Sequence, residues 1–391
     1  MKRSVSRLDE YLADRDLDGY LLDADGTNSN QHYLSGFDAP DPFLTLYTPE
    51  HMAILTSPLE YARAESSSRA DSVRRWSAYD YRAKKDEHGR DAARGLVIGE
   101  FLDEFTAESV ATDRRFPLFT ADSIREQGKT VSADLEDVIE EIRATKTETE
   151  RGHIQDAQQA NEAAMAAAES MISEAEIGPD GSLSVEEEVL TSERIKATIE
   201  RTLLDRGYAM DQTIVASGPD GAIPHERGSG PISADEPVIV DIFPQSKETN
   251  YHADMTRTFL RGEPGPQIRA FYERTQEAKQ AGMAAIEPGA TGAEVHDAVC
   301  DVYEEAGYAT LRSDESTETG FIHSTGHGVG LDVHEHPRIG PDGGTLEPGH
   351  VITIEPGLYD PSIGGVRIED LVIVTDDGYE NLTDYPETLL I

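Results

Sequence analysis

The sequence is poor in cysteine, in basic charge and in long apolar runs, and each shortage excludes a class of protein. The single cysteine, Cys300, excludes an intramolecular disulfide framework and a thiolate zinc cluster, and it fits a reducing cytoplasm. No apolar run approaches the roughly 18–20 residues that a membrane-spanning helix needs. The opening MKRSVSRLDEYLADRD has basic residues but no apolar core of a secretory signal. We therefore expect a soluble cytoplasmic protein with no membrane partner.

Acidic residues dominate the charge. There are 76 Asp and Glu against 34 Lys and Arg, and the formal net charge is −42. The acids are dispersed, as in 80–91, 134–141 and 186–188, which is typical of a coat over a folded body rather than an acidic tail. Such a surface repels phosphate backbones, so no nucleic-acid partner is expected. We hypothesise adaptation to a salt-rich cytoplasm, where a Debye length of about 3 Å at 1 M salt screens self-repulsion. The alternative is an acidic enzyme of an ordinary cytoplasm.

The length of 391 residues predicts two or three domains. Short apolar runs indicate strands, and their alternation with helical patterns predicts an α/β domain over residues 1–132. The predicted strands are 19–22, 44–47, 52–55, 95–99 and 109–111, with a hairpin across Pro49. A linker helix is predicted over 133–147, with Leu135, Val138, Ile139 and Ile142 on one face.

The remaining residues, 148–391, are predicted to form a second domain of α+β type. Helical patterns cover 153–176, 266–286 and 291–306, and a Thr cap opens the last of these. Strand patterns cover 238–243, 251–260, 351–355 and 366–375.

Four carboxylates interrupt apolar segments of this second domain. Asp241 follows PVIV, Glu355 ends VITI, Glu369 lies in VRIE, and Asp254 belongs to an alternating stretch. A buried carboxylate is costly unless it is paired or bound to a cation. Arg367 is the one obvious counter-charge on the same face, so these acids point to bound metal ions.

A fifth candidate ligand lies in the segment GFIHSTGHGVGLDVHE. His327 stands there between Gly326 and Gly328, which allow the backbone to approach closely. Four carboxylates and one imidazole form a mainly oxygen donor set that suits Mn²⁺, Co²⁺ or Zn²⁺. The lack of CxxC and HExxH patterns disfavours a His-rich zinc-protease site. That many anionic ligands can share two ions, as in several hydrolases.

Five strings carry a resemblance to a known family. VIVDIFPQ, YHADMTRTF, HSTGHGVGLDVHE, VITIEPG and VRIEDLVIV resemble, in this order, the motifs of the pita-bread metallopeptidases, which include methionine aminopeptidase, aminopeptidase P and prolidase. Residues 1–132, notably NQHYLSGFDAP, resemble the creatinase/prolidase-type N-terminal domain. The resemblance implies an α/β creatinase/prolidase-like domain, then an α+β pita-bread catalytic domain, and a homodimer.

The resemblance also implies the roles of individual residues. It implies a dinuclear metal centre, with Mn²⁺ first and Co²⁺ or Zn²⁺ as alternatives, at Asp241, Asp254, His327, Glu355 and Glu369, of which Asp254 and Glu369 bridge the ions. The ions would activate a bridging water, with Glu355 as the general base. His225, His323 and His334 match family histidines that are implied to orient substrate and stabilise the tetrahedral intermediate.

Two further residues are candidates for a supporting role around the ligands. Thr256 shares the face of Asp254, and Arg367 shares the face of Glu369. Arg367 could either orient ligands or meet a substrate carboxylate. Asp254 follows Asp241 by 13 positions, a longer spacing than is usual in the family. Two extra residues in the turn 245–250 would preserve the register because the strand period is two.

Within the family, the large N-terminal domain argues against methionine aminopeptidase, and the intact ligand set argues against creatinase. The expected activity is hydrolysis of the bond between an N-terminal residue and proline in short peptides. A dipeptidase is favoured, and aminopeptidase P, which acts on longer peptides, is the alternative. A catalytically silent pita-bread binding protein is a further alternative, disfavoured because all five ligand positions are present.

Overall fold

The computed structural model describes residues 5–210 and 212–391. They form two compact units that divide between Arg143 and Ala144, inside the span predicted as a linker helix. Among the described residues, no helix combines the length and the apolar character that crossing a membrane requires.

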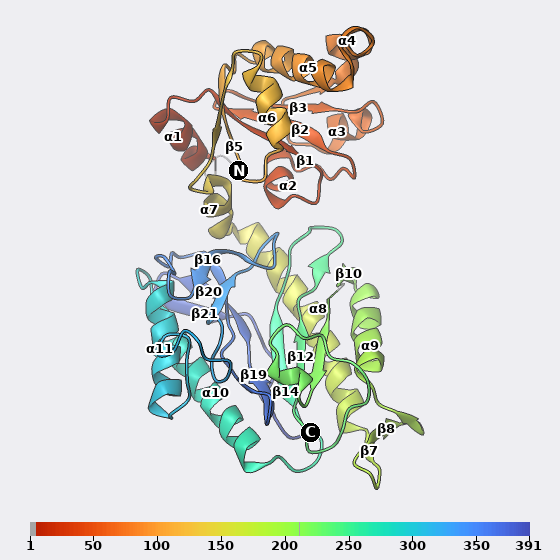
Figure 1. Ribbon diagram of the computed structural model, residues 1–391, viewed down its shortest axis with the longest axis vertical. Coiled ribbons are helices and arrows are strands. Elements are labelled where there is room, and N and C mark those ends of the chain that lie inside the picture. Colours follow the sequence, from red (N-terminus) through yellow and green to blue (C-terminus); the bar gives the residue numbers. More distant parts are fainter. Residues whose placement is uncertain (1–4, 211) are drawn as a thin grey trace. The chain divides into compact units, whose positions relative to one another are not determined.

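A mixed six-stranded sheet forms the centre of the first unit, with helices packed around it (Figure 1). The strand order is β4-β3-β2-β1-β5-β6. The strands are β1 (Gly19–Ala24), β2 (Phe43–Thr48), β3 (His51–Thr56), β4 (Ser72–Arg75), β5 (Ser109–Thr112) and β6 (Thr130–Ala133). The helices are α1 (Ser6–Asp14), α2 (Ser29–Ser35), α3 (Tyr61–Ser67), α4 (Tyr81–His88), α5 (Arg90–Glu104), α6 (Leu118–Arg125) and α7 (Val138–Ala144), with a 3₁₀ turn η1 (Trp76–Tyr79).

The predicted hairpin across Pro49 is confirmed, because β2 and β3 pair antiparallel on either side of it. The strand predicted over 95–99 is wrong, since these residues lie inside α5. The short apolar run 96–98, which lies between two glycines, predicts a strand by its length alone. Buried Ala93, Val97 and Phe101, however, recur every four residues, and this longer helical period determines the structure.

The linker helix predicted over 133–147 is correct only over α7, since residues 145–147 are not helical. Residues 130–133 form β6, and α7 begins at Val138. Asp134 explains the late start, because its carboxylate accepts hydrogen bonds from the backbone N–H groups of Glu136 and Val138. Leu135, predicted on the buried face, is instead 72% exposed.

The second unit has helices on two sides of a set of small sheets (Figure 1). Helix α8 packs against α9 and the strands β12 and β14, whereas α10 packs against α11 and the strands β17 to β19. The helices are α8 (Glu148–Ser173), α9 (Ser192–Leu204), α10 (Pro266–Ala284) and α11 (Gly292–Glu305), with a 3₁₀ turn η2 (Asp220–Ala222).

Two of these sheets matter for function. The first has the order β11-β12-β14, with β11 (Ile214–Ser217), β12 (Val238–Ile242) and β14 (Met255–Phe259). The second has the order β16-β15-β17-β20-β21, with β15 (Gly326–Gly328), β16 (Glu335–Ile339), β17 (Val351–Ile354), β20 (Asp370–Thr375) and β21 (Gly378–Asn381).

Three smaller sheets complete the unit: β10 (Tyr208–Ala209) with β13 (Gln245–Ser246), β18 (Gly357–Asp360) with β19 (Gly364–Arg367), and β7 (Glu176–Ile177), β8 (Leu183–Val185) and β9 (Glu188–Val189). The strand predicted over 366–375 is therefore two strands, β19 and β20, that belong to different sheets. The α/β unit followed by an α+β unit confirms the predicted fold class.

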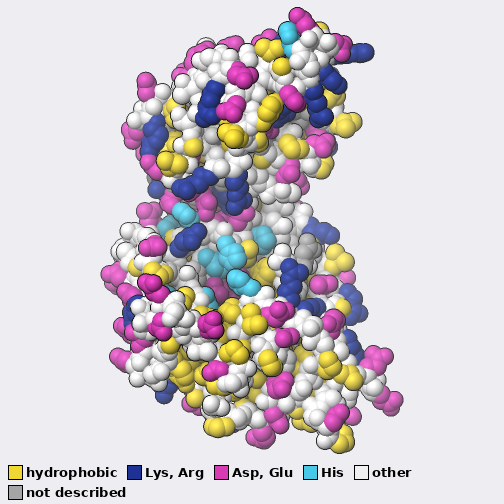
Figure 2. Space-filling view, viewed as in Figure 1, with side chains coloured by type: hydrophobic (Ala, Val, Ile, Leu, Met, Phe, Trp, Pro, Cys, Tyr) yellow, Lys and Arg dark blue, Asp and Glu magenta, His cyan; other side chains and the backbone are white. Residues whose placement is uncertain are grey.

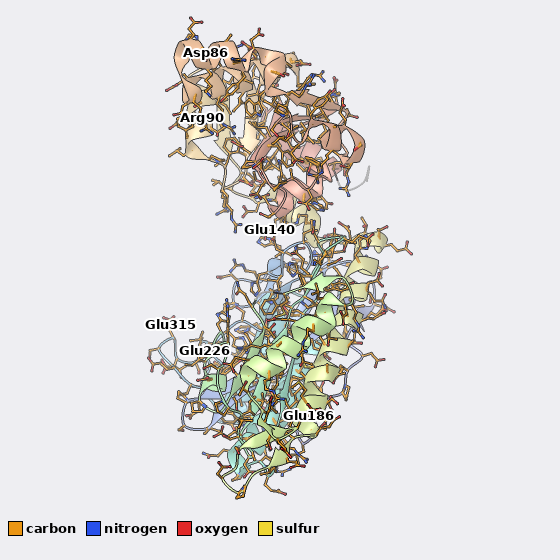
Figure 3. All side chains as sticks on the ribbon, turned by 90° about the vertical axis from the view of Figure 1, so that its right-hand side faces the viewer. Asp86, Arg90, Glu140, Glu186, Glu226 and Glu315 are labelled. Atoms are coloured by element: carbon orange, nitrogen blue, oxygen red, sulfur yellow. The ribbon has the colours of Figure 1, made fainter. Side chains whose placement is uncertain are left out.

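Acidic side chains lie on the outside of both units. Asp86 in the first unit and Glu186, Glu226 and Glu315 in the second are exposed (Figure 3). The predicted acidic coat thus consists of surface groups on loops and helices.

Candidate metal centre

The two aspartates come from neighbouring strands of the first sheet. Asp241 of β12 pairs directly with Thr256 of β14. Asp254 lies two positions before Thr256, so Asp241, Thr256 and Asp254 are on the same face. The long connection between them folds as the short strand β13 and a bridge between Gln245 and His252, which keeps this register.

The other three candidates come from the second sheet. His327 is in the middle of β15, Glu355 follows the last residue of β17, and Glu369 precedes the first residue of β20. Strands β17 and β20 are antiparallel, with Ile354 paired to Asp370, so the next residues outward, Glu355 and Glu369, face each other at the strand ends. The antiparallel pairing of β17 and β20 thus brings both glutamates to the same end of the two strands.

The donor atoms of these residues converge. One ligand atom from each of Asp254, His327 and Glu369 lies within 4.8 Å of the others. His327 Nε2 is 3.7 Å from an oxygen of Asp254 and 3.2 Å from Oε1 of Glu355. Within the described residues, Asp241 Oδ1 is buried and has no hydrogen-bond partner. A buried, unpartnered carboxylate oxygen beside three converging donors fits divalent cations.

The electrostatics of the acids also fit a cation. Burial raises the pKa of Asp254 well above its usual range, and repulsion from Glu369 and Asp241 adds to the effect. Burial and repulsion from Glu355 and Asp241 likewise raise the pKa of Glu369 well above its usual range. Burial raises the pKa of Asp241, although Arg367 opposes the shift. These carboxylates therefore lack the positive charge that would keep them all ionised.

Glu355 behaves differently because it pairs with His327. Burial alone would raise the pKa of Glu355, but the hydrogen bond and charge of His327 lower it to about 2. Burial lowers the pKa of His327, and the bond to Glu355 outweighs this and raises it. A metal ion would need the neutral imidazole, so binding would displace this proton.

Further histidines gather beside the ligands (Figure 2). The rings of His327 and His334 have centroids 4.2 Å apart. His323 donates from Nδ1 to the carbonyl of Ser324 at 2.7 Å, which leaves Nε2 to accept from the Tyr359 hydroxyl at 3.0 Å. Burial lowers the pKa of His323 to about 4. Burial and the nearby His327 lower the pKa of His334 to about 4, so both rings are neutral at pH 7.

His225 lies on the exposed loop after η2, and among the described residues no hydrogen bond, ion pair or ring contact joins it to the ligands, so its role stays a prediction. The contacts bring three of the four candidate histidines, His323, His327 and His334, to one site.

Arg367 and Thr256 link the ligands. Arg367 donates to Oδ2 of Asp241 at 2.7 Å, to Oγ1 of Thr256 at 3.2 Å and to the hydroxyl of Tyr359 at 2.9 Å. Thr256 in turn donates to Oε2 of Glu369 at 2.8 Å. Because the donors of Arg367 are engaged with protein groups, the geometry favours its orienting role over contact with a substrate carboxylate.

Sequence reasoning missed two contributors. Tyr359 connects His323 to Arg367. Thr353 accepts from the backbone N–H of His327 at 3.1 Å, and its hydroxyl lies 3.3 Å from Oε1 of Glu355. A hydroxyl on the strand that ends in Glu355 was a signal for Thr353. Tyr359 belongs to a different sheet, so no spacing rule identifies it.

Comparisons with known proteins identify the family of both units. Metallopeptidase family M24 matches residues 152–376, and the creatinase/prolidase N-terminal domain matches residues 5–145. The Xaa-Pro dipeptidase of Pyrococcus horikoshii is 30% identical over 398 aligned positions, which cover 100% of this chain and 99% of that protein.

Solved structures give the same picture. The prolidase of Pyrococcus horikoshii superposes with a TM-score of 0.80 at 28% identity over 99% of both chains. The X-Pro aminopeptidase of Thermotoga maritima shares the fold, with a TM-score of 0.77 at 24% identity over 96% of this chain and 98% of that one.

The fold and the site define a two-domain metal-dependent peptidase. The chain belongs to metallopeptidase family M24 and carries the creatinase/prolidase N-terminal domain.

Proposed function

We propose that the protein hydrolyses the peptide bond before proline in dipeptides, with two divalent cations bound at Asp241, Asp254, His327, Glu355 and Glu369. The observation that carries the proposal is the convergence of these buried donors beside neutral histidines. The relatives named as Xaa-Pro dipeptidase and prolidase, which the chain matches from end to end, support the substrate class.

The chemistry divides between the cations and the side chains. When bound, the two cations supply a nucleophile at neutral pH and polarise the scissile carbonyl. Glu355 follows the last residue of β17, with its Oε1 3.2 Å from His327 Nε2, and its carboxylate can accept a proton from the attacking water. His334 remains neutral, and its N–H group can donate to the carbonyl oxygen as negative charge develops there. The one N–H of neutral His323 already donates to Ser324, so His323 orients the site through its bond with the Tyr359 hydroxyl.

Arg338 supports a dipeptide rather than a longer substrate. It pairs directly with His327 across β15 and β16, so the two side chains are on one face. Arg338 is exposed, and within the described residues its side chain has no hydrogen bond or ion pair. An available guanidinium beside the reacting groups suits the free carboxylate of a C-terminal proline, which is bound bidentately. A longer peptide has no carboxylate at this position.

The deciding experiment compares substrates. Metal-free protein is loaded with Mn²⁺ and given Xaa-Pro, Xaa-Pro-amide and Xaa-Pro-Yaa peptides. We expect cleavage of the dipeptide, and we expect Arg338→Ala to raise its KM at least about tenfold, as one charge-assisted contact implies. The same substitution should leave the weak cleavage of the amide unchanged. Preferred cleavage of the tripeptide would support aminopeptidase P activity, and no cleavage at all would support a silent binding protein.

The ligand assignment has its own test. Asp254→Ala removes a carboxylate on which other ligands converge, so we expect hydrolysis to be abolished while the far-UV circular dichroism spectrum is retained. Glu226→Ala, at an exposed loop position, is the control and should keep full activity. Full turnover by the Asp254 variant would refute the assignment.

The identity of the metal, the binding partners and the cellular setting belong to the same proposal. We propose Mn²⁺ as the metal because oxygen donors dominate the site. We also propose short proline-containing peptides as the only partners besides a second copy in a homodimer, with no nucleic acid and no membrane, and a salt-rich cytoplasm as the setting. The acidic surface supports the exclusion of nucleic acid and the salt-rich setting.

A further inference from the structure

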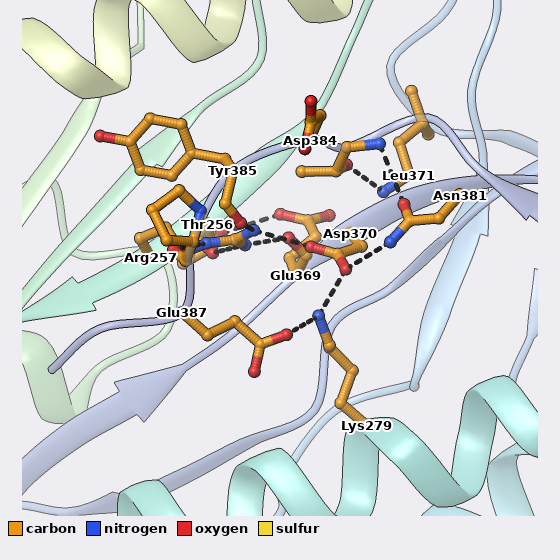
Figure 4. Close-up of polar contacts among 12 residues, drawn as sticks. Thr256, Arg257, Lys279, Glu369, Asp370, Leu371, Asn381, Asp384, Tyr385 and Glu387 are labelled. Atoms are coloured by element: carbon orange, nitrogen blue, oxygen red, sulfur yellow. Dashed lines mark hydrogen bonds and ion pairs between the residues drawn. The ribbon is translucent and has the colours of Figure 1, made fainter.

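A buried network of charges lies behind the candidate metal centre (Figure 4). It consists of Arg257, Lys279, Asp370 and Glu387, called the clamp here. The side chains of Arg257, Lys279 and Asp370 are 1%, 5% and 7% exposed. None of these four residues belongs to the ligand set, and the proposed hydrolysis has no step that uses them.

Arg257 is the hub of the clamp. It follows Thr256 on β14, so its side chain points away from the face that carries Asp254. Its guanidinium has five N–H groups, and all five have acceptors. These are the carbonyls of Thr256 at 3.0 Å, Glu369 at 2.6 Å, Tyr385 at 2.8 Å and Pro386 at 3.1 Å, and Oδ1 of Asp370 at 2.8 Å.

The remaining members hold Asp370 in place. Lys279, from α10, donates to Oδ2 of Asp370 at 2.5 Å and also forms an ion pair with Glu387. Asn381 donates to the same oxygen of Asp370 at 2.9 Å. Both carboxylate oxygens of Asp370 therefore have hydrogen-bond partners. Because Asp370 follows Glu369 directly, these bonds and the bond from Arg257 to the Glu369 carbonyl fix the backbone at Glu369 from β14, α10 and the C-terminal segment.

These contacts join the two ligand-bearing sheets at one point. The backbone N–H of Glu369 donates to the carbonyl of Thr256 at 3.0 Å, and its carbonyl accepts from Arg257. Its side chain accepts from the hydroxyl of Thr256. Glu369 is therefore fixed through its backbone and its side chain to the strand that follows Asp254, and it cannot retreat from Asp254 without breaking these bonds.

The clamp counteracts the electrostatic repulsion between two of the candidate ligands. The ligand atoms of Asp254, Glu369 and His327 lie within 4.8 Å of one another, so the two carboxylates repel whenever both are ionised without a cation between them. A buried ion network adds little stability compared with apolar packing, so its presence behind these two ligands needs a specific role. Holding both carboxylates at metal-binding distance is such a role.

We propose that Arg257 is a positioning residue that keeps Glu369 and Asp254 pre-organised for divalent cations, with Lys279, Asp370 and Glu387 holding Arg257 and Asp370 in place. The inference rests on the proposed function only in taking these carboxylates as metal ligands. It assigns to a buried arginine, on the opposite face of β14 from the site, control over metal affinity.

The experiment measures Mn²⁺ binding to the full-length metal-free protein by calorimetry. Arg257→Lys keeps a positive charge but cannot reach all five acceptors. We expect its affinity for Mn²⁺ to fall about 10–100-fold, the usual effect of changing a group that orients metal ligands. Hydrolysis should recover toward the wild-type rate at saturating Mn²⁺, because the reacting side chains are intact.

Arg261→Lys is the matched control. Arg261 also donates to backbone carbonyls, of Ala175 at 3.2 Å and of Ile391 at 3.3 Å, but it does not contact Glu369. It should bind Mn²⁺ within about twofold of the wild type, because neither of its two bonds reaches Glu369. Equal affinities of the two lysine variants would overturn the proposal and leave Arg257 a purely structural residue.

A second variant covers the case in which Arg257→Lys does not fold. Lys279→Met leaves Arg257 in place but removes one donor from Asp370, so we expect a smaller loss of Mn²⁺ affinity in the same direction. Unchanged affinity would overturn the proposal. If the wild type binds Mn²⁺ but does not cleave Xaa-Pro dipeptides, the proposed function fails, and the affinity comparison still decides the role of the clamp.

Discussion

At the scale of single residues, Asp254 and Glu369 define the chemistry of the site. Their pKa values are raised by burial and by repulsion from neighbouring carboxylates, so the metal-free protein holds protons there that free carboxylates would release. A cation must displace those protons. Metal affinity and pH are therefore linked, and the sign follows from the direction of the shifts.

We predict that Mn²⁺ binding releases protons, at least about one per chain near pH 6. As pH rises through the raised pKa values, the protons leave without the metal, so release should decrease and affinity should increase. Calorimetry in buffers with different protonation enthalpies measures the release. Glu369→Gln removes one proton carrier and should reduce it. Heats that do not depend on the buffer would contradict the prediction.

At the scale of elements, the sequence predicts those parts that depend on local pattern. The hairpin of β2 and β3 and the helices α8, α10 and α11 follow from periodicity and turn residues. The candidate ligands stand out because a charge inside an apolar strand is unusual. In each case the signal lies within about ten residues of the element it predicts.

Other features depend on contacts that no local pattern contains. The run at 95–99 becomes part of α5 because Ala93, Val97 and Phe101 share a buried face. Arg257 could not be assigned a role, since its acceptors at Glu369 and Tyr385 lie more than a hundred positions away. Tyr359 reaches the site from a separate sheet, β18 with β19. Long-range packing determines these features.

The glycines beside His327 link the sequence to the geometry of a whole sheet. A Cβ atom on Gly326 would lie 2.0 Å from the carbonyl oxygen of Thr353, and one on Gly328 would lie 2.1 Å from that of His336. Strand β15 can therefore lie against β16 and β17 only because these residues have no side chain. This close approach places His327 beside Glu355.

We predict that Gly326→Ala forces β15 away from β17 and moves His327 off its position. Overpacking of this kind costs about 1–3 kcal/mol of unfolding free energy. Urea unfolding should show that loss, and hydrolysis at saturating Mn²⁺ should fall further than the loss of folded protein explains. Gly344→Ala is the control, because a Cβ there would meet no atom within 4 Å. Equal effects of the two substitutions would show that the close approach has no role.

At the scale of the whole molecule, burial removes several lysines from the surface, so acidic side chains outnumber basic ones there by a larger factor than in the full sequence. Three of the eight lysines, Lys129, Lys146 and Lys279, are buried. Surface cations are therefore mostly arginines, and these serve several acids at once. Arg312 donates to Asp301 and Glu304 and to Asp297, all on α11. With 76 acidic against 34 basic residues, each unit keeps an excess of acidic charge that such bridges do not neutralise.

Repulsion within this excess of acidic charge predicts a stability that depends on salt. Screening shortens the Debye length from about 10 Å at 0.1 M to about 3 Å at 1 M, so added KCl should weaken repulsion in the folded state. We expect the unfolding temperature to rise by at least roughly 10 °C between 0.1 and 2 M KCl, which corresponds to several kcal/mol for a chain of this size. Circular dichroism against temperature at each concentration measures the shift.

The control separates screening from the general effect of solutes. Sucrose stabilises folded proteins by exclusion from their surface but does not screen charge. If repulsion between acids limits stability, sucrose at matched concentration should give a much smaller shift than KCl, and the KCl effect should flatten once the Debye length falls below the spacing of neighbouring acids. An unfolding temperature that KCl leaves unchanged would instead mean that arginine bridges such as those of Arg312 already neutralise the coat, and the salt-rich setting would have no physical support.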